Sequence, residues 1–228
     1  MPDDRARNVR VVCFDVDGTL VEHAEDKTIW QILNVTFHDG AELNKLRFGA
    51  FQSGLISYDE WVALDILDWK SRGVRRQSIA DLIESSLVPA EGARETIDGL
   101  RRRGLRVVVI SGTLGITLDL LLPGLRFDKV FTNEIEFDDE GRISGWRATP
   151  FDVHGKAAAI ELVASEFDVS PEQCAFVGDG WNDLHAFERA GYGIAYKPKI
   201  EEVRSAADVV IESGSLTRVL ELIPGDGR

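Results

Sequence analysis

Three segments of the chain are almost continuously apolar and rich in β-branched residues. They lie at 9–14, 106–110 and 174–177, and each ends in a short polar or glycine-rich stretch. Runs of this length are typical of strands buried on both faces, as in a parallel sheet. Weaker runs of the same character follow at 129–132, 193–196 and 208–211.

Amphipathic stretches separate these apolar runs. Ala93, Ile97 and Leu100 recur at helical spacing within 91–103, and Gly104 is a typical residue after a helix C-terminus. Strands that alternate with helices predict a doubly wound α/β fold with a parallel sheet. Further helices are expected at 113–122, 156–167 and 182–190, and a peripheral β-hairpin at 134–146.

The segment 22–88 has a different pattern, without a strand-like run. Ser57-Tyr58-Asp59-Glu60 is a capping box that opens one of its helices. We expect an all-helical insertion at 22–88, placed between the two parts of a core formed by 1–21 and 89–228. Its four helical stretches are 27–38, 41–52, 57–71 and 75–87.

Composition narrows the class of protein. With 228 residues and 44% hydrophobic content, the chain is long enough for a globular domain with a sizeable core. No apolar stretch approaches the roughly 18 residues of a membrane span, and the N-terminus lacks the apolar region of a signal peptide. Cys13 and Cys174 lie in apolar runs, so we expect buried thiols and a cytoplasmic protein.

The net charge of −13 argues against a nucleic-acid partner, since phosphate backbones attract basic surfaces. One basic cluster, 101–103, lies at the end of a predicted helix, where cations are favoured by the helix dipole. We expect neither nucleic acid nor membrane as a partner, and the sequence does not determine the oligomeric state.

Two carboxylates follow the first predicted strand. Asp15 and Asp17 point to the same side by strand alternation, at the carboxyl end of a buried strand, where open α/β sheets bind ligands. A calcium-binding EF-hand loop is a competing interpretation. It fails because Gly18 would be the fourth residue of the loop rather than the sixth, and because no helix precedes it.

The other two apolar runs also end in polar residues. Ser111 and Gly112 offer a hydroxyl and an amide to an anion, and Asp179 and Asp183 lie four residues apart in Gly-Asp-Gly-Trp-Asn-Asp. Taken alone, each stretch is explained by a helix cap, and Lys156 is explained as a surface lysine. Taken together, several carboxylates at one sheet edge repel each other, which predicts a divalent cation and phosphoryl chemistry.

In this order, four motifs resemble those of the haloacid dehalogenase (HAD) superfamily. They are Asp-Val-Asp-Gly-Thr at 15–19, Ser-Gly-Thr at 111–113, Lys156, and the six residues 178–183. The segment 22–88 resembles the helical C1 cap of that superfamily, and the layout is most similar to phosphoserine phosphatases. The resemblance implies a magnesium-dependent phosphomonoester hydrolase that acts on a small phosphorylated metabolite through an aspartyl phosphate.

The resemblance also implies a role for each motif residue. Asp15 would be the nucleophile and Asp17 the general acid and base. Ser111, Gly112 and Lys156 would bind the phosphoryl oxygens, and Lys156 would also neutralise the nucleophile.

For Mg²⁺, the resemblance implies the Asp15 side chain, the Asp17 carbonyl and Asp179 as ligands. Asp183 would complete or orient that set, and Asn182 would lie beside the phosphate and the substrate.

The insertion departs from phosphoserine phosphatases, whose cap arginine binds the substrate carboxylate. The matching region offers Trp61, Val62 and Ala63, with Arg47 and Arg72 as the nearest arginines. The substrate is therefore open between phosphoserine and a sugar or other phosphate. A phosphotransferase or mutase and a non-catalytic binding module are alternatives on the same scaffold.

Trp181 is larger than the residue that related enzymes usually carry at that position. It either packs under its loop or narrows the mouth of the pocket.

Overall fold

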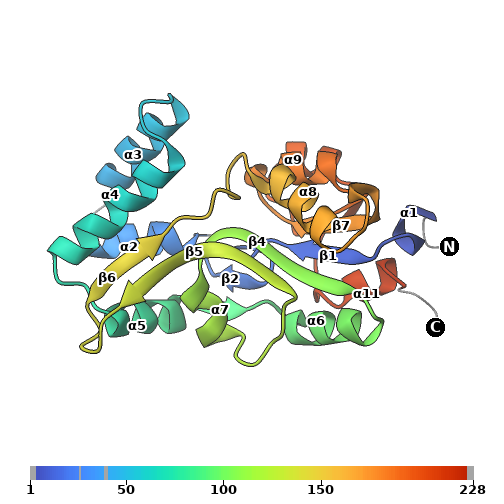
Figure 1. Cartoon of the computed structure of the whole chain (residues 1–228), viewed down its shortest axis with the longest axis horizontal. Coiled ribbons are helices and arrows are strands. Elements are labelled where there is room, and N and C mark those ends of the chain that lie inside the picture. The colour runs from blue at the N-terminus through green and yellow to red at the C-terminus, as the bar shows by residue number, and fades with distance from the viewer. Residues whose placement is uncertain (1–3, 26, 39–40, 225–228) are drawn as a thin grey trace.

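A seven-stranded sheet forms the centre of the protein in a computed structural model that describes residues 4–25, 27–38 and 41–224. Its order is β6-β5-β4-β1-β7-β8-β9, and every neighbouring pair is parallel except β5 and β6 (Figure 1). The doubly wound parallel sheet and its peripheral hairpin are thus confirmed. The strands are β1 (Val11–Phe14), β4 (Arg106–Leu114), β5 (Lys129–Phe137), β6 (Ile143–Arg147), β7 (Cys174–Gly178), β8 (Tyr192–Tyr196) and β9 (Val209–Ile211).

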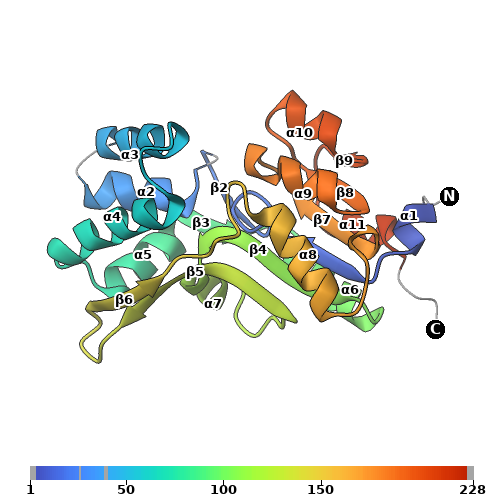
Figure 2. The same ribbon diagram turned by 45° about the horizontal axis from the view of Figure 1, so that its top comes forward.

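Helices cover both faces of the sheet (Figures 1 and 2). Successive side chains of β1 enter opposite cores: Val12 and Phe14 pack on one face, Val11 and Cys13 on the other. Cys13 and Cys174 are free and buried, as expected. The first face carries α6 (Ala93–Arg102), α7 (Gly115–Leu121) and α11 (Arg218–Leu222), and the second carries α8 (Lys156–Glu166), α9 (Leu184–Arg189) and α10 (Glu201–Ala206).

Four helices, hereafter the cap helices, lie beside the β5–β6 end of the sheet (Figure 2). Reciprocal side-chain caps start two of them, at Thr28 and at the expected Ser57. The buried Trp69 links two of these helices, because its ring stacks on the ring of Trp30 with centroids 5.2 Å apart. The helices are α2 (Ile29–Phe37), α3 (Glu42–Gln52), α4 (Tyr58–Ser71) and α5 (Arg76–Ser86), close to the four stretches expected.

Two expectations about strands are wrong. The segment 22–88 was expected to lack strands, but its ends form β2 (Val21–His23) and β3 (Leu87–Pro89), which pair antiparallel. These two strands are the chain segments that lead into and out of the cap helices. Because they lie side by side, their backbone groups form hydrogen bonds with each other, and this pairing requires no apolar pattern in the sequence. The second predicted strand also continues through Leu114 instead of ending before Ser111, with a register shift between Ile110 and Leu114.

A short helix, α1 (Asp4–Arg7), precedes the first strand and was not expected. The predicted division into a core of 1–21 and 89–228 and an insertion of 22–88 stays a prediction, and both outer ends of the core lie outside the described residues.

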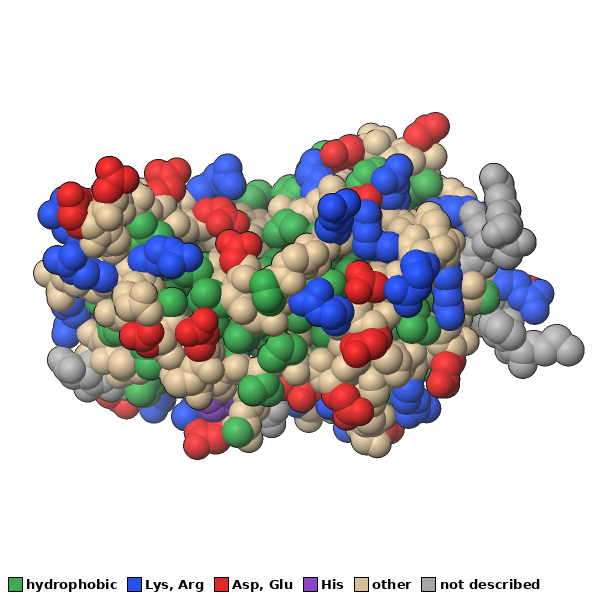
Figure 3. All heavy atoms as spheres, turned by 90° about the horizontal axis from the view of Figure 1, so that it is seen from below, with side chains coloured by type: hydrophobic (Ala, Val, Ile, Leu, Met, Phe, Trp, Pro, Cys, Tyr) green, Lys and Arg blue, Asp and Glu red, His purple; other side chains and the backbone are tan. Residues whose placement is uncertain are grey.

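The surface that carries α5, α6 and α7 mixes acidic, basic and hydrophobic side chains (Figure 3). None of the helices in the described residues has the length and apolar character that crossing a membrane requires.

Candidate active site

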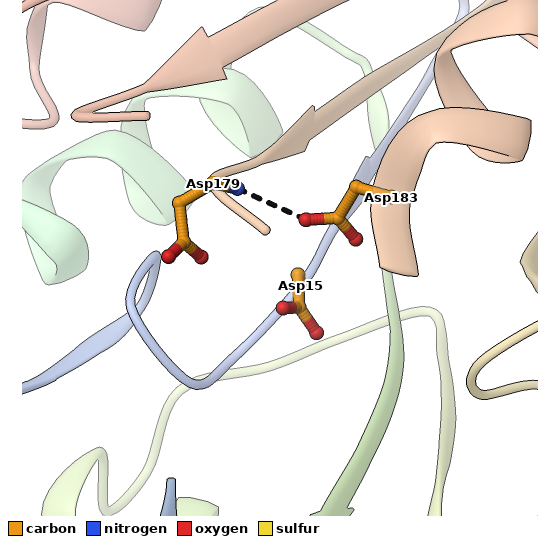
Figure 4. A group of neighbouring side chains, drawn as sticks. All are labelled: Asp15, Asp179 and Asp183. Atoms are coloured by element: carbon orange, nitrogen blue, oxygen red, sulfur yellow. Dashed lines mark hydrogen bonds between the residues drawn. The ribbon is translucent and has the colours of Figure 1, made fainter. Parts of the chain in front are cut away.

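Three carboxylates converge at the carboxyl end of the central strands (Figure 4). Asp15 directly follows β1, Asp179 follows β7, and Asp183 precedes α9, and all three are buried. One oxygen from each lies within 4.8 Å of the others. Asp183 is held in place because its Oδ2 accepts 2.9 Å hydrogen bonds from the amides of Asp179 and Gly180.

Lys156, the first residue of α8, lies among these acids. Its Nζ is 2.8 Å from Oδ1 of Asp15 and 2.6 Å from Oδ1 of Asp183, and its side chain is fully buried. Burial alone would lower the pKa of Lys156, but the charges of Asp15 and Asp183 outweigh it and raise that pKa. The interpretation as a surface lysine is therefore wrong: Lys156 is a buried ammonium.

Two further acids have strongly perturbed pKa values. Burial, assisted by the charge of Asp15, raises the pKa of Asp17 to about 7. Burial and the charges of Asp15 and Asp183 raise the pKa of Asp179 to about 8. Buried carboxylates are this costly to ionise when cations do not balance them.

This donor set fits a hard divalent cation such as Mg²⁺, because it offers several carboxylate oxygens within a short distance of each other. Oδ1 of Asp17 is buried with no hydrogen-bond partner among the described residues. The backbone also comes close to the acids: a Cβ at Gly18 would lie 2.1 Å from Oδ2 of Asp179. The assignment of Asp15, Asp17, Asp179 and Asp183 as the metal set stays a prediction.

The residues expected to bind phosphate lie in the same cavity as Asp15 and Asp17. Ser111, Gly112 and Asn182 line it, and its volume is about 380 Å³. The carbonyl of Gly112 accepts a 2.7 Å hydrogen bond from Nε1 of Trp30, which connects the end of β4 to α2. Lys156 is not among the residues that line the cavity, but it contacts Asp15, which is.

Two site residues were missed in the sequence. Asp152 lies in the cavity, where its Oδ1 accepts a 3.2 Å hydrogen bond from Asn182, and burial raises its pKa. Lys199 places its Nζ 3.3 Å from Oδ2 of Asp179. The position of each residue in the sequence could have indicated its place in the site. Asp152 precedes Lys156 by four residues, and Lys199 comes just after the carboxyl end of β8.

The cap helices form the other wall of the cavity. Trp181 lines it as well, with 45% of the residue exposed and its ring in an edge contact with Phe48 at 6.3 Å. Trp181 therefore narrows the mouth of the cavity rather than packing under its loop. Arg47 is not among the residues that line the cavity, because its guanidinium binds Asp65 and Asp68.

An α/β sheet with an acidic site at the carboxyl ends of its strands is the arrangement of one class of hydrolases. Comparison of the sequence with known protein families identifies that class. Residues 9–191 match the family model of the haloacid dehalogenase-like hydrolases, and the chain belongs to that family.

Among curated proteins, the chain is similar to phosphoserine phosphatases. It is 32% identical over 218 residues to the phosphoserine phosphatase of Archaeoglobus fulgidus, covering 95% of this chain and 60% of that protein. It is 33% identical to phosphoserine phosphatase SerB2 of Mycobacterium tuberculosis, covering 95% of this chain and 51% of that protein. The chain thus spans between half and three fifths of these two relatives. With the Wolinella succinogenes phosphoserine phosphatase it shares 30% identity, covering 93% of this chain and 98% of that protein.

Solved structures agree with this relationship. A phospho-aspartyl intermediate analogue of phosphoserine phosphatase superposes with a TM-score of 0.71 at 27% identity, covering 94% of this chain and 99% of that one. A substrate-bound phosphoserine phosphatase complex gives a TM-score of 0.72 at 26% identity, covering 94% and 98%.

Proposed function

We propose that the chain is a magnesium-dependent phosphomonoester hydrolase that acts on a small phosphorylated metabolite through an aspartyl phosphate on Asp15. The observation that carries the proposal is the buried cluster of Asp15, Lys156, Asp179 and Asp183, in which Asp15 also lines a cavity together with Asp17. The proposed nucleophile, the proposed general acid, the ammonium group of Lys156 and the acids proposed to bind the metal ion thus lie close together. The similarity to phosphoserine phosphatases supports the same reaction class.

In the first half of the reaction, an oxygen of Asp15 forms a bond to phosphorus while the bond from phosphorus to the ester oxygen breaks. Asp17 donates its proton to the departing alcohol. A pKa of about 7 supports this role, because the carboxyl group then keeps its proton near neutral pH. Lys156 stays charged beside Asp15 and offsets the negative charge of the phosphoryl group.

In the second half, the ionised Asp17 accepts a proton from water while that water attacks the phosphorus. The bond between phosphorus and Asp15 breaks, which releases phosphate and restores both carboxyl groups to their starting state. Ser111, the amide of Gly112 and Asn182 are proposed to hold the phosphoryl oxygens in line with Asp15. Asp15, Asp179 and the carbonyl of Asp17 would hold Mg²⁺, with Asp183 completing or orienting that set, and the ion would supply additional neutralisation of phosphoryl charge.

The test is hydrolysis of p-nitrophenyl phosphate with and without Mg²⁺ by the chain and by Asp15→Asn. The substitution keeps the size of the side chain, so we expect a folded protein that has lost activity. The control is Asp119→Asn, an exposed acid on α7 outside the site, which should keep full activity. Full activity of Asp15→Asn would refute the proposal.

The same assay separates hydrolysis from the alternative of phosphoryl transfer. With glycerol added as an acceptor alcohol, a hydrolase still releases one inorganic phosphate per nitrophenol. A deficit of phosphate matched by a phosphorylated acceptor would identify a phosphotransferase instead. Lack of Mg²⁺-dependent turnover across a broad panel of phosphorylated metabolites would favour the non-catalytic binding module.

A further inference from the structure

The side of the cavity formed by the cap helices is walled by aromatic rings, which we call the aromatic wall. Trp30 comes from α2, Phe48 from α3, Tyr58 and Trp61 from α4, and Trp181 reaches the same cavity from the core. A volume of about 380 Å³ lies within the roughly 300–1,000 Å³ of small-molecule sites. Because Asp15 and Ser111 line the same cavity, an ester whose phosphoryl group binds at Asp15 would place its leaving alcohol against the aromatic wall.

The charges around this wall are unfavourable for a carboxylate. Asp17, Asp65 and Asp152 line the cavity, whereas Lys45 is the one lysine or arginine among the described residues that line it. The Lys45 side chain is 70% exposed and pairs with Glu42. Arg47 balances the charge of Asp65, and Asp17 carries the proton of the proposed first step. Asp152 is thus the acid that an anionic leaving group would meet, with no buried lysine or arginine among the described lining residues, whereas a cationic leaving group would be attracted.

Neighbouring rings of the wall are inclined steeply to each other. The interplanar angle is 50° between Phe48 and Trp61, 81° between Tyr58 and Trp61, and 65° between Phe48 and Trp181. A flat ring system stacks best between two parallel faces. Inclined rings instead suit a compact, rounded cation, which is attracted to the face of each ring it meets.

Several polar side chains of the cap that reach the cavity already form hydrogen bonds within the cap, whereas Tyr58 bonds to Asn133 of the core and Nε1 of Trp61 has no partner among the described residues. Thr28 and Gln31 form the reciprocal cap of α2, and Oδ1 of Asn44 accepts a hydrogen bond from Asn34. Oδ1 and Oδ2 of Asp65 accept from Arg47 and Asn34. A primary ammonium needs three acceptors for its N–H groups, whereas a quaternary ammonium needs none.

We propose that the aromatic wall selects phosphomonoesters whose alcohol carries a quaternary ammonium group, of the phosphocholine type. The inference rests on the proposed phosphatase function, and it replaces phosphoserine by an organic cation as the favoured substrate class. The aromatic rings attract the quaternary ammonium group, and the carboxyl groups that line the cavity favour its positive charge. The methyl groups on its nitrogen need no hydrogen-bond acceptors.

The first experiment compares esters on the unmodified chain with Mg²⁺. Phosphocholine is matched with 3,3-dimethylbutyl phosphate, which has the same shape but a neutral carbon in place of nitrogen. We expect kcat/KM for phosphocholine to exceed that for the neutral ester by about tenfold, which lies between the scales of an exposed and a desolvated cation–π contact. Phosphoethanolamine and phosphoserine complete the panel, and both should fall below phosphocholine.

Variants of Trp61 then test the wall itself. Nε1 of Trp61 has no hydrogen-bond partner among the described residues, so Trp61→Phe removes no hydrogen bond and keeps a ring. We expect Trp61→Phe to keep the preference for phosphocholine over the neutral ester, and Trp61→Leu to reduce it about fivefold. Phe37→Leu is the matched control, because Phe37 packs on Trp69 and does not line the cavity. Its preference should be unchanged.

The outcomes separate the two proposals. Equal kcat/KM for phosphocholine and its neutral isostere, or a preference for phosphoserine, overturns the cation inference while nitrophenyl phosphate hydrolysis that depends on Asp15 still supports the phosphatase. Absence of turnover on every ester overturns both. An unchanged preference in a folded Trp61→Leu variant also overturns the role given to the wall.

Discussion

Nζ of Lys199 lies 3.3 Å from Oδ2 of Asp179, so an ammonium group stands against one of the acids assigned to the cation. The lysine follows β8, and the acid follows β7, the neighbouring strand of the sheet. The Lys199 side chain is 41% exposed, whereas that of Asp179 is 3% exposed. The lysine can therefore move toward solvent, but Asp179 cannot.

We predict that Lys199→Ala lowers the Mg²⁺ concentration that gives half-maximal activity by about fivefold, since like charges a few ångströms apart repel even when solvent screens them. A titration of phosphatase activity with Mg²⁺ measures this. Lys197→Ala removes the same charge from the same loop, but Lys197 pairs with Glu22. Its titration should match that of the unmodified chain, and weaker Mg²⁺ binding by Lys199→Ala would contradict the prediction.

Lys156 is expected to support stability as well as chemistry. Lys156→Met leaves the buried Asp15 and Asp183 without their cation, so the free energy of unfolding of the metal-free protein should fall by about 3–5 kcal/mol. Denaturant unfolding measures it. Lys129→Met breaks the pair with Glu166 at the surface and should cost under about 1 kcal/mol.

A second substitution separates charge from packing at the same place. In Lys156→Met/Asp183→Asn, one uncompensated charge is gone, so part of the lost stability should return while activity stays lost. No recovery in the double variant would mean that Lys156 acts by filling space.

Gly18 is predicted to be required by two separate constraints. Its φ of +90° is unfavourable for other residues, and an added Cβ would lie 2.1 Å from Oδ2 of Asp179. Gly73 has a similar φ of +72° but open space around it. Gly18→Ala and Gly73→Ala should each cost about 1–2 kcal/mol of stability from the backbone. Only Gly18→Ala should also lose activity, by more than tenfold in our estimate from displaced Asp179. Equal activity of the two variants would contradict the close approach seen here.

The stability of the metal-free protein should depend on pH. The pKa of Asp17 is raised to about 7 and that of Asp179 to about 8, from 3.8, by burial above all. Between about pH 4 and pH 8 the folded chain thus holds protons that the unfolded chain has released, so stability falls as pH rises.

Thermal unfolding with a chelator at about pH 5.5 and about pH 8.5 checks this sign, with the higher Tm expected at the lower pH. Mg²⁺ should recover Tm at the higher pH, because the cation replaces the protons. Asp179→Asn should show a smaller pH dependence and a smaller gain with Mg²⁺. A Tm of the metal-free protein that rises with pH would contradict the argument.

The positions of the acids could be predicted from the sequence because they follow the strongest apolar runs. Asp15 and Asp179 follow strands that are buried on both faces, and such strands leave an unmistakable pattern. Applied to the weaker run at 193–196, the same argument would have found Lys199.

Burial of a charged side chain, in contrast, is decided by tertiary contacts. Lys156 begins a helix, and the residues around it in the sequence indicate a surface lysine; the family resemblance alone placed it beside Asp15, and its contact with Asp183 came only from the structure. The strands β2 and β3 were missed for a related reason, since each is three residues long and is stabilised by its partner across 64 residues or more of chain, as in the pairing of His23 with Leu87. The cap rings that line the cavity could not be identified from the sequence, because the direction in which each ring points depends on how the cap helices pack.

The last prediction concerns Trp181, whose ring meets Phe48 of α3 at 6.3 Å in an edge contact. One ring belongs to the core and the other to the cap helices, so the pair stabilises the arrangement in which the cavity is enclosed. Such a pair is worth about 0.5–1.5 kcal/mol, which corresponds to a factor of roughly 2 to 12 in binding. We expect Trp181→Ala and Phe48→Ala each to raise KM for p-nitrophenyl phosphate about threefold.

A double-mutant cycle tests whether the two rings act together. If they do, the double variant should raise KM little more than either single change, whereas independent effects would multiply to about ninefold. Leu46→Ala is the control, because this residue of the same helix is 70% exposed, and its KM should be unchanged. Multiplicative effects would mean that Trp181 and Phe48 contact the substrate separately, and that the enclosed cavity does not depend on their contact.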